Sequence, residues 1–172
     1  EEDFQPVTEI DGSISITEVS LTLIQQMTQL ATYGMQNPKP RILIENALVS
    51  SSRKIGADKT HLKLQLEQNG TELDSIGFGF GEIVDHLSPL ASVSVIGELA
   101  INEWNNIKKP QLFLQDISVD DWQLFDCRKG NGIIQVKTIP DRRKIILFKD
   151  ESSQWLPEYT KENDEIVYIP SI

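Results

Sequence analysis

Cysteine and histidine are scarce in this sequence. Cys127 is the only cysteine, so an intrachain disulfide and a cysteine metal cluster are both excluded. The two histidines, His61 and His86, do not have the H-x-x-H or H-E-x-x-H spacing of zinc sites. We find no paired histidine that could activate Cys127. The cysteine content fits a reducing, cytoplasmic setting.

Long apolar runs and phosphate-binding loops are also missing. No apolar run reaches the roughly 18 residues of a membrane span, and no secretory signal pattern is present. The glycine-rich segment 77–81 contains neither G-x-G-x-x-G nor a following Lys-Ser/Thr pair, so its glycines indicate strand curvature or a bulge. With no catalytic constellation in the chain, these absences favour binding over catalysis.

The chain has 172 residues, which suffices for one ordinary domain or two small ones. It begins with Glu1-Glu2-Asp3 rather than Met, and it ends directly after a strand-like run. We therefore expect it to be a piece of a longer protein.

Most of the chain has strand-like patterns. Apolar and polar residues alternate strictly from His61 to Leu66, which predicts a half-buried strand, and Asn69-Gly70 after it predicts a hairpin. Phe78 and Phe80 are predicted to lie in the core with the inward residues of their strand. The remaining runs are Ile42–Val49, Leu73–Phe80, a short helix at Glu82–Leu87, Val93–Gly97 with the Trp104 loop after it, and Leu112–Ile117.

Three strands, a short helix and two strands are the element order of the OB-fold, a five-stranded Greek-key barrel. A sandwich of short strands would need more strands and no helix between the third and the fourth. We therefore predict a mainly β protein built on a five-stranded OB-fold barrel at residues 41–118.

A helix is predicted before the barrel, from Ser15 to Ala31. Ser15 and Glu18 form a capping box, and Gly34 can take the left-handed position at the helix end. Pro38 and Pro40 then favour an extended link. The helix presents one apolar stripe, formed by Val19, Leu23, Met27 and Leu30.

A smaller α/β-like module is predicted after the barrel. The segment from Asp120 to Asp126 is amphipathic, with Asp120 well placed at a helix start. The other predicted elements are strands at Ile133–Val136, Lys144–Phe148 and Ile166–Ile169 and a short helix or turn at Gln154–Tyr159. The expected divisions are thus residues 1–40, 41–118 and 119–172.

The net charge of −10 argues, taken alone, against nucleic acid as a partner. However, residues 41–63 and 104–149 are net positive, and an OB-fold can bring these places near one groove. The segment 50–59 holds three serines and three cations, so it is either a phosphate-contacting loop or an ordinary exposed loop. The candidate DNA-binding residues are Arg41, Arg53, Lys54, Lys59, His61, Lys63, Lys108 and Lys109 for the backbone and Trp104 or Phe113 for base stacking.

Several motifs, taken together, resemble the RecJ family of bacterial single-strand-specific 5′-to-3′ exonucleases, members of the DHH phosphoesterase superfamily. Their order and spacing match over about residues 20–128. One departure is Thr32-Tyr33-Gly34, where the family usually has Pro-Phe-Gly. The motifs are Gly34-Met35-x-Asn37-Pro38-Lys39-Pro40, Arg53-Lys54-Ile55-Gly56, His61-Leu62-Lys63-Leu64, Ile76-Gly77-Phe78-Gly79, Gly97-Glu98-Leu99-x-Ile101-Asn102-Glu103-Trp104-Asn105 and Pro110-Gln111-Leu112.

The resemblance implies a division of labour in the parent protein. The manganese (or magnesium) site of such enzymes lies in N-terminal domains whose Asp and His motifs are absent here, so no cofactor is expected in this fragment. Residues 1–40 would end the DHH-associated domain, and 119–172 would begin the C-terminal extension. The OB-fold would hold single-stranded DNA and guide it in recombination and repair.

An alternative is a protein-interaction module. Arg142, Arg143 and Lys144 would then receive an acidic tail such as that of single-strand DNA-binding protein. A stand-alone enzyme is a third hypothesis. No membrane partner is expected.

Overall fold

A computed structural model describes residues 8–30, 39–120, 123, 145–148 and 165–168. The chain divides into two compact units, residues 1–124 and 125–172. In the first unit the elements are β1 (Gly12–Ser13), the 3₁₀ helix η1 (Ile16–Glu18), α1 (Leu21–Leu30), β2 (Ile42–Ile55), β3 (His61–Gln68), β4 (Thr71–Gly77), the 3₁₀ helix η2 (Gly81–His86), β5 (Ser92–Trp104) and β6 (Ile107–Val119).

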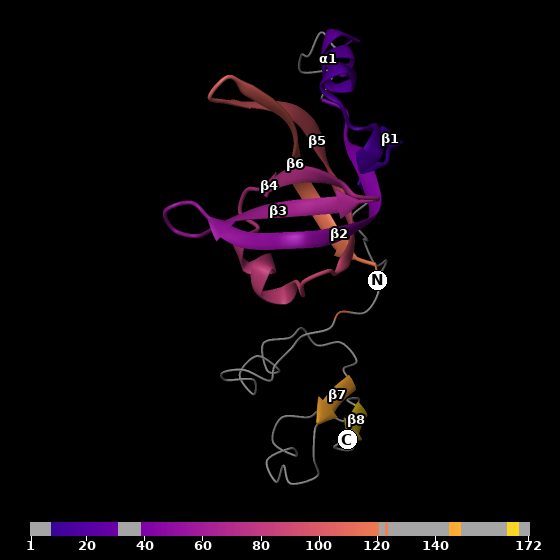
Figure 1. Ribbon diagram of the computed structural model, residues 1–172, viewed down its shortest axis with the longest axis vertical. Helices are drawn as coiled ribbons and strands as arrows, with labels where there is room; N and C mark the ends of the chain where they lie inside the picture. Colours follow the sequence, from indigo (N-terminus) through magenta and orange to yellow (C-terminus); the bar gives the residue numbers. More distant parts are fainter. Residues whose placement is uncertain (1–7, 31–38, 121–122, 124–144, 149–164, 169–172) are drawn as a thin grey trace, which may run out of the picture. The chain divides into compact units, whose positions relative to one another are not determined.

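Five strands of the first unit close into a barrel (Figure 1). The strand order is β2-β3-β4-β6-β5, and β5 pairs again with β2. All neighbours are antiparallel except β4 and β6, which run parallel. The short strand β1 adds to β2 in parallel. The element order and the closure confirm the predicted mainly β, five-stranded OB-fold barrel, with a helix before it.

The barrel core is aliphatic. Leu62, Leu64 and Leu66 of β3 are fully buried, as their strict alternation with polar residues predicts. The hairpin after β3 is confirmed as well. Asn69 and Gly70 both have positive φ, 53° and 77°, which suits the right-handed twist of the flanking strands.

The prediction of one continuous helix from Ser15 to Ala31 is wrong, because the segment forms η1 and then α1 with a break between them. The capping box of Ser15 and Glu18 is present, but it caps only η1. Val19 leaves the helix with ψ 116°, and the Leu23 N–H donates to Ser20 Oγ at 3.1 Å at the start of α1. The break turns Ile24 into the core, whereas Val19, Leu23 and Met27 of the predicted stripe are only partly buried.

The predicted loop at residues 50–59 is wrong in its first half, because β2 continues through Ile55 and only residues 56–59 form the turn. A bulge between Val49 and Ser51 shifts the register with β3, and pairing then runs to Ile55 opposite His61. This half of β2 tolerates serine and basic residues because much of it faces solvent. The Trp104 loop is likewise the end of β5, and only Asn105 and Asn106 form the turn to β6.

Phe78 is not a core residue. The inward side chains of β4 are Leu73 and Ser75, and Gly77 continues their face. Phe78 therefore follows Ile76 on the outer face, and its side chain is 60% exposed. Phe80 lies beyond the strand end, where it is half-buried and packs against the core.

The second unit contains two described strands, β7 (Ile145–Phe148) and β8 (Glu165–Tyr168), which pair in parallel. They agree with the strands predicted at Lys144–Phe148 and Ile166–Ile169. The other predicted elements of this unit lie outside the described residues, as do Gly34 and most of the segment from Asp120 to Asp126.

Candidate nucleic-acid interface

A row of side chains crosses the outer face of the barrel on five neighbouring strands. Arg53 of β2 lies opposite Lys63 of β3, which in turn lies opposite Ile76 of β4. Ile76 is in register with Phe113 of β6, and Phe113 with Glu98 of β5. Paired residues of neighbouring strands point to the same face of a sheet. Residues far apart in the sequence are thus gathered on one surface.

Three aromatic rings form the centre of this surface, which we call the aromatic platform: His61, Phe78 and Phe113. The Phe78 and Phe113 rings are stacked, with centroids 6.1 Å apart and planes at 22°. The His61 ring meets Phe78 edge-on, at 5.2 Å and 77°. Because Phe78 is 60% exposed, the platform offers a flat π surface to solvent.

His61 is held in place from two sides. Its Nδ1 accepts a hydrogen bond from the Gly79 N–H at 3.1 Å. On the other side lies Gly56, where a Cβ would come within 3.2 Å of His61 Cδ2. Gly56 also has a φ of +89°, which side chains rarely adopt. The glycines around His61 therefore allow the backbone to approach and fix this ring.

Carboxylates bind three of the predicted cations. Lys63 Nζ lies 2.9 Å from Asp74 Oδ2, and the two side chains are 18% and 30% exposed. Lys54 pairs with Asp85 of η2 at 2.6 Å, and Lys108 with Glu103 at 3.6 Å. Within the described part of the chain, no ion pair is formed by Arg41, Arg53, Lys59 or Lys109.

The β5–β6 hairpin carries a second exposed aromatic residue. Trp104 and Ile107 pair across the turn and are 75% and 60% exposed. The register from Phe113 to Ile107 is unbroken, so Lys109 and Trp104 share the face of Phe113, while Lys108 points to the opposite face.

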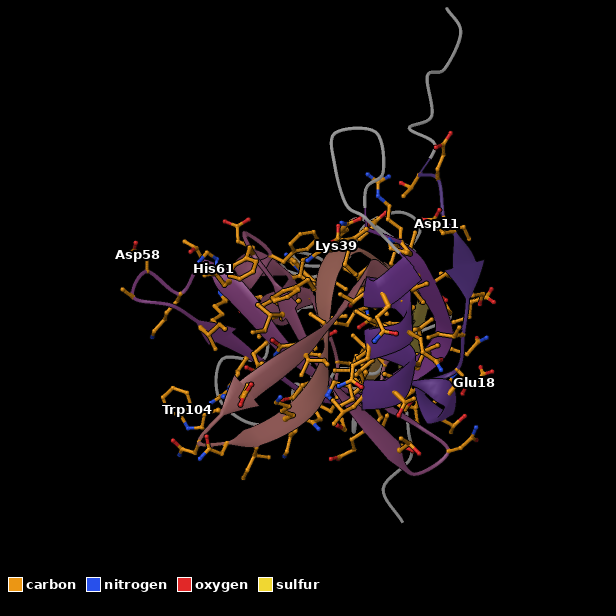
Figure 2. All side chains as sticks on the ribbon, turned by 90° about the horizontal axis from the view of Figure 1, so that it is seen from above. Asp11, Glu18, Lys39, Asp58, His61 and Trp104 are labelled. Carbon is orange, nitrogen blue, oxygen red and sulfur yellow. The ribbon has the colours of Figure 1, made fainter. Side chains whose placement is uncertain are left out.

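Two turns flank the aromatic platform. The β2–β3 turn with Asp58 and the hairpin tip with Trp104 extend to the same side of the barrel, where His61 also lies (Figure 2). In an OB-fold the face of the second and third strands and these two turns are where oligonucleotides bind. Here those strands are β3 and β4.

The structure brings some of the predicted binding residues together and places others elsewhere. Arg53, Lys63, His61 and Phe113 share the outer face. Arg41 lies at the start of β2, where its backbone is bonded to Asp11. Other predicted residues are placed as follows: Lys59 in the β2–β3 turn, Lys54 on the opposite face of β2 from Arg53, and Arg142, Arg143 and Lys144 outside the described residues.

Sequence reasoning missed Phe78 as a surface residue. The signal was available, because Ile76 and Phe78 are two residues apart and so share a face that Leu73 and Ser75 do not. It also missed Asp74 and Glu98, the acidic neighbours of the platform, whose place depends on pairing between distant strands.

Within the described ranges, no three side chains of His, Cys, Asp or Glu gather in a way that could hold a metal ion. Nor does any described helix have the length and apolarity to cross a membrane.

Comparison with known proteins identifies the barrel. The family model of the RecJ OB domain matches residues 10–116. The chain belongs to the RecJ OB-domain family. It is 43% identical to the single-stranded-DNA-specific exonuclease RecJ of Bacillus subtilis, over 91% of this chain and 20% of that protein. It is 29% identical to RecJ of Haemophilus influenzae, over 70% of this chain and 21% of that protein.

The chain therefore spans about a fifth of the length of the curated relatives it matches. One similar solved structure is RecJ of Thermus thermophilus in complex with Mn²⁺, which is 24% identical in sequence. The match covers 59% of this chain and 15% of that chain, with a TM-score of 0.43. Another is the second single-stranded DNA binding protein of Mycobacterium smegmatis, which is 15% identical in sequence. That match covers 46% of this chain and 84% of that chain, with a TM-score of 0.41.

Proposed function

We propose that this chain is the single-stranded-DNA-binding, substrate-guiding region of a RecJ-like 5′-to-3′ exonuclease that acts in recombination and repair in the cytoplasm. The observation that carries the proposal is the exposed aromatic platform of His61, Phe78 and Phe113 on the OB-fold face. Bases of a single strand stack on such rings, whichever bases they are, and cations beside them contact the phosphates.

The cations at the rim suit the path of a DNA backbone. Arg53 lies across the sheet from the platform, Lys59 is exposed in the β2–β3 turn, and Lys109 continues the face of Phe113 along the hairpin. Trp104 at the hairpin tip would offer one more stacking surface. Bases would therefore lie over the centre of the face and phosphates along its edges.

No step of hydrolysis is assigned to the described residues, because they contain no group of side chains that fits a metal ion. The manganese or magnesium of the parent enzyme belongs, on this proposal, to domains outside the chain. Residues 1–40 would be the end of the DHH-associated domain and its linker helix, residues 41–118 the OB-fold, and residues 119–172 the start of the C-terminal extension.

The test is fluorescence anisotropy of a labelled single-stranded oligonucleotide at two salt concentrations, with duplex as competitor. We expect salt-sensitive binding that duplex competes poorly. Phe78→Ala should weaken it by about fivefold or more, since one base–aromatic stack contributes about 1–3 kcal/mol. Leu90→Ala is the control, because Leu90 is 70% exposed but lies before β5, away from the platform. Equal single-strand affinity of Phe78→Ala and the native chain would show that the aromatic platform does not bind the single strand.

The interaction module remains a second proposal. Its basic segment would bind an acidic tail such as that of single-strand DNA-binding protein. The double variant Arg142→Glu with Arg143→Glu should abolish capture of that protein while leaving DNA binding intact. Capture that survives the double variant would contradict this role.

A further inference from the structure

A carboxylate stands next to the aromatic platform where a DNA-binding face would be expected to be positive. Asp74 of β4 points to the same face as Ile76 and Phe113 and binds Lys63 at 2.9 Å. On the other side of the platform, Glu98 lies directly opposite Phe113 and accepts a hydrogen bond from Gln115 Nε2 at 2.7 Å. The strand of Phe113 thus lies between the two strands that carry these acidic side chains.

The Asp74–Lys63 pair is placed where it reduces the positive charge of the face. Lys63 and Arg53 are directly opposite one another on neighbouring strands, an arrangement of two cations that attracts phosphate. Asp74 neutralises one of the two. Both side chains of the pair are largely buried, at 18% and 30% exposed, so salt screens their attraction less than it screens that of surface ions.

Single strands and duplex respond differently to such a reduction. An unpaired base can stack on Phe78 and Phe113, so a single strand gains affinity that does not depend on charge. The bases of a duplex are stacked on one another, so a duplex depends on contacts between cations and phosphates. Removing a cation from the face therefore costs the duplex a larger share of its affinity, and specificity commonly comes from disfavouring the competitor in this way.

We propose that Asp74 is a specificity-determining residue, which holds Lys63 away from phosphates and so favours single-stranded over double-stranded DNA. The inference rests on the proposed function, because it requires that DNA binds on this face. The partly buried Lys63–Asp74 ion pair would then help to discriminate between the two forms of DNA.

The experiment compares Asp74→Asn with Glu72→Gln in the full chain. Glu72 is on the same strand and the same face, and its neutralisation changes the net charge equally, but its hydrogen-bond partner is the Gln65 amide at 3.1 Å, not a cation. Affinity is measured by anisotropy for a labelled single-stranded oligonucleotide and for the same sequence as a blunt duplex, over a series of salt concentrations.

For Asp74→Asn we expect duplex affinity to rise about three- to fivefold, the size of one exposed charge contact, with a smaller rise for the single strand. The slope of log affinity against log salt should steepen for duplex by about one. Glu72→Gln should raise both affinities by the same small factor. In a Lys63→Gln background, Asp74→Asn should raise duplex and single-strand affinity only by the same small factor as Glu72→Gln.

An equal rise for both DNA forms, or an equal effect of Glu72→Gln, would overturn the inference. If Phe78→Ala still weakens single-strand binding in that case, the role of Asp74 is rejected while the proposed function stands. If neither the native chain nor Asp74→Asn binds either DNA, the proposed function is overturned together with it.

Discussion

Phe78 and Phe113 stack on the outer face of the barrel with their ring centroids 6.1 Å apart. Phe78 directly follows β4, and Phe113 lies within β6, in register with Ile76. These two strands are neighbours only because the barrel closes through their parallel pairing. The pairing that completes the fold therefore also builds the platform on which bases are proposed to stack.

Arg53 and Lys54 are adjacent in the sequence but belong to opposite faces of β2. Arg53 lies beside Lys63 on the platform face, whereas Lys54 binds Asp85 of η2 at 2.6 Å. We expect Arg53→Gln to lower the salt slope of single-strand binding by about 0.7, the value for one phosphate contact. Lys54→Gln should leave that slope unchanged. The measurement is a salt titration by anisotropy, and equal slopes for the two variants would remove Arg53 from the interface.

Much of the barrel could be predicted from the sequence, because its signals are local. Alternation in β3, the Asn69-Gly70 turn and the short helix between the third and fourth strands each follow from neighbouring residues. The wrong boundaries have a physical reason too. The second half of β2 reads as a loop because its serines and cations are stabilised by pairing with β3, which no local pattern reveals.

The site was harder to predict than the fold. His61, Lys63 and Phe113 were found as single residues, but the row that joins them depends on the register of four pairs of strands. Phe78 was assigned to the core because the face that it shares with Ile76 was taken as the inward face of the strand. Such errors are expected for an exposed aromatic side chain at the end of a strand.

Lys108 and Lys109 provide a second matched pair, on the hairpin. Lys109 continues the face of Phe113, and Lys108 points the other way, 3.6 Å from Glu103. Reversal of charge by Lys109→Glu should weaken single-strand binding about fivefold, since an attraction to phosphate becomes a repulsion. Lys108→Glu should have a clearly smaller effect. A gel-shift titration measures the single-strand affinity of both variants. A larger loss of affinity for Lys108→Glu would show that DNA follows the opposite face of the hairpin.

Gly97 is needed where β5 crosses close to β6. A Cβ at this position would lie 2.3 Å from the Phe113 carbonyl oxygen and 3.0 Å from Leu112 Cγ. We expect Gly97→Ala to lower the free energy of unfolding by about 1–3 kcal/mol, the usual cost of an overpacked core. Gly12→Ala is the control, because a Cβ added there would have no atom within 4 Å apart from those of its chain neighbours. Urea denaturation measures both, and similar midpoints would contradict the close approach.

Gln68 at the end of β3 joins the N-terminal segment to the barrel. Its Oε1 accepts hydrogen bonds from the Ile16 N–H at 2.8 Å and the Ser15 hydroxyl at 2.9 Å, and its Nε2 donates to the Glu45 carbonyl at 2.8 Å. Gln68→Ala would remove the side chain that binds the Ile16 N–H and the Glu45 carbonyl, although the Ser15 hydroxyl keeps its contact with Thr17 Oγ1 at 2.8 Å. We expect a loss of about 1–3 kcal/mol in unfolding free energy.

Hydrogen exchange at the Ile16 amide distinguishes the loss of the Gln68 hydrogen bond from a general loss of stability. In Gln68→Ala the Ile16 amide should exchange much faster while the amides of β3 change only by the global loss, because the partner removed belongs to that amide. Gln65→Ala is the matched control on the same strand, since the Gln65 amide binds only the exposed Glu72 carboxylate. Unchanged protection of Ile16 in Gln68→Ala would mean that packing of the buried Ile16 side chain, rather than Gln68, holds η1 on the barrel.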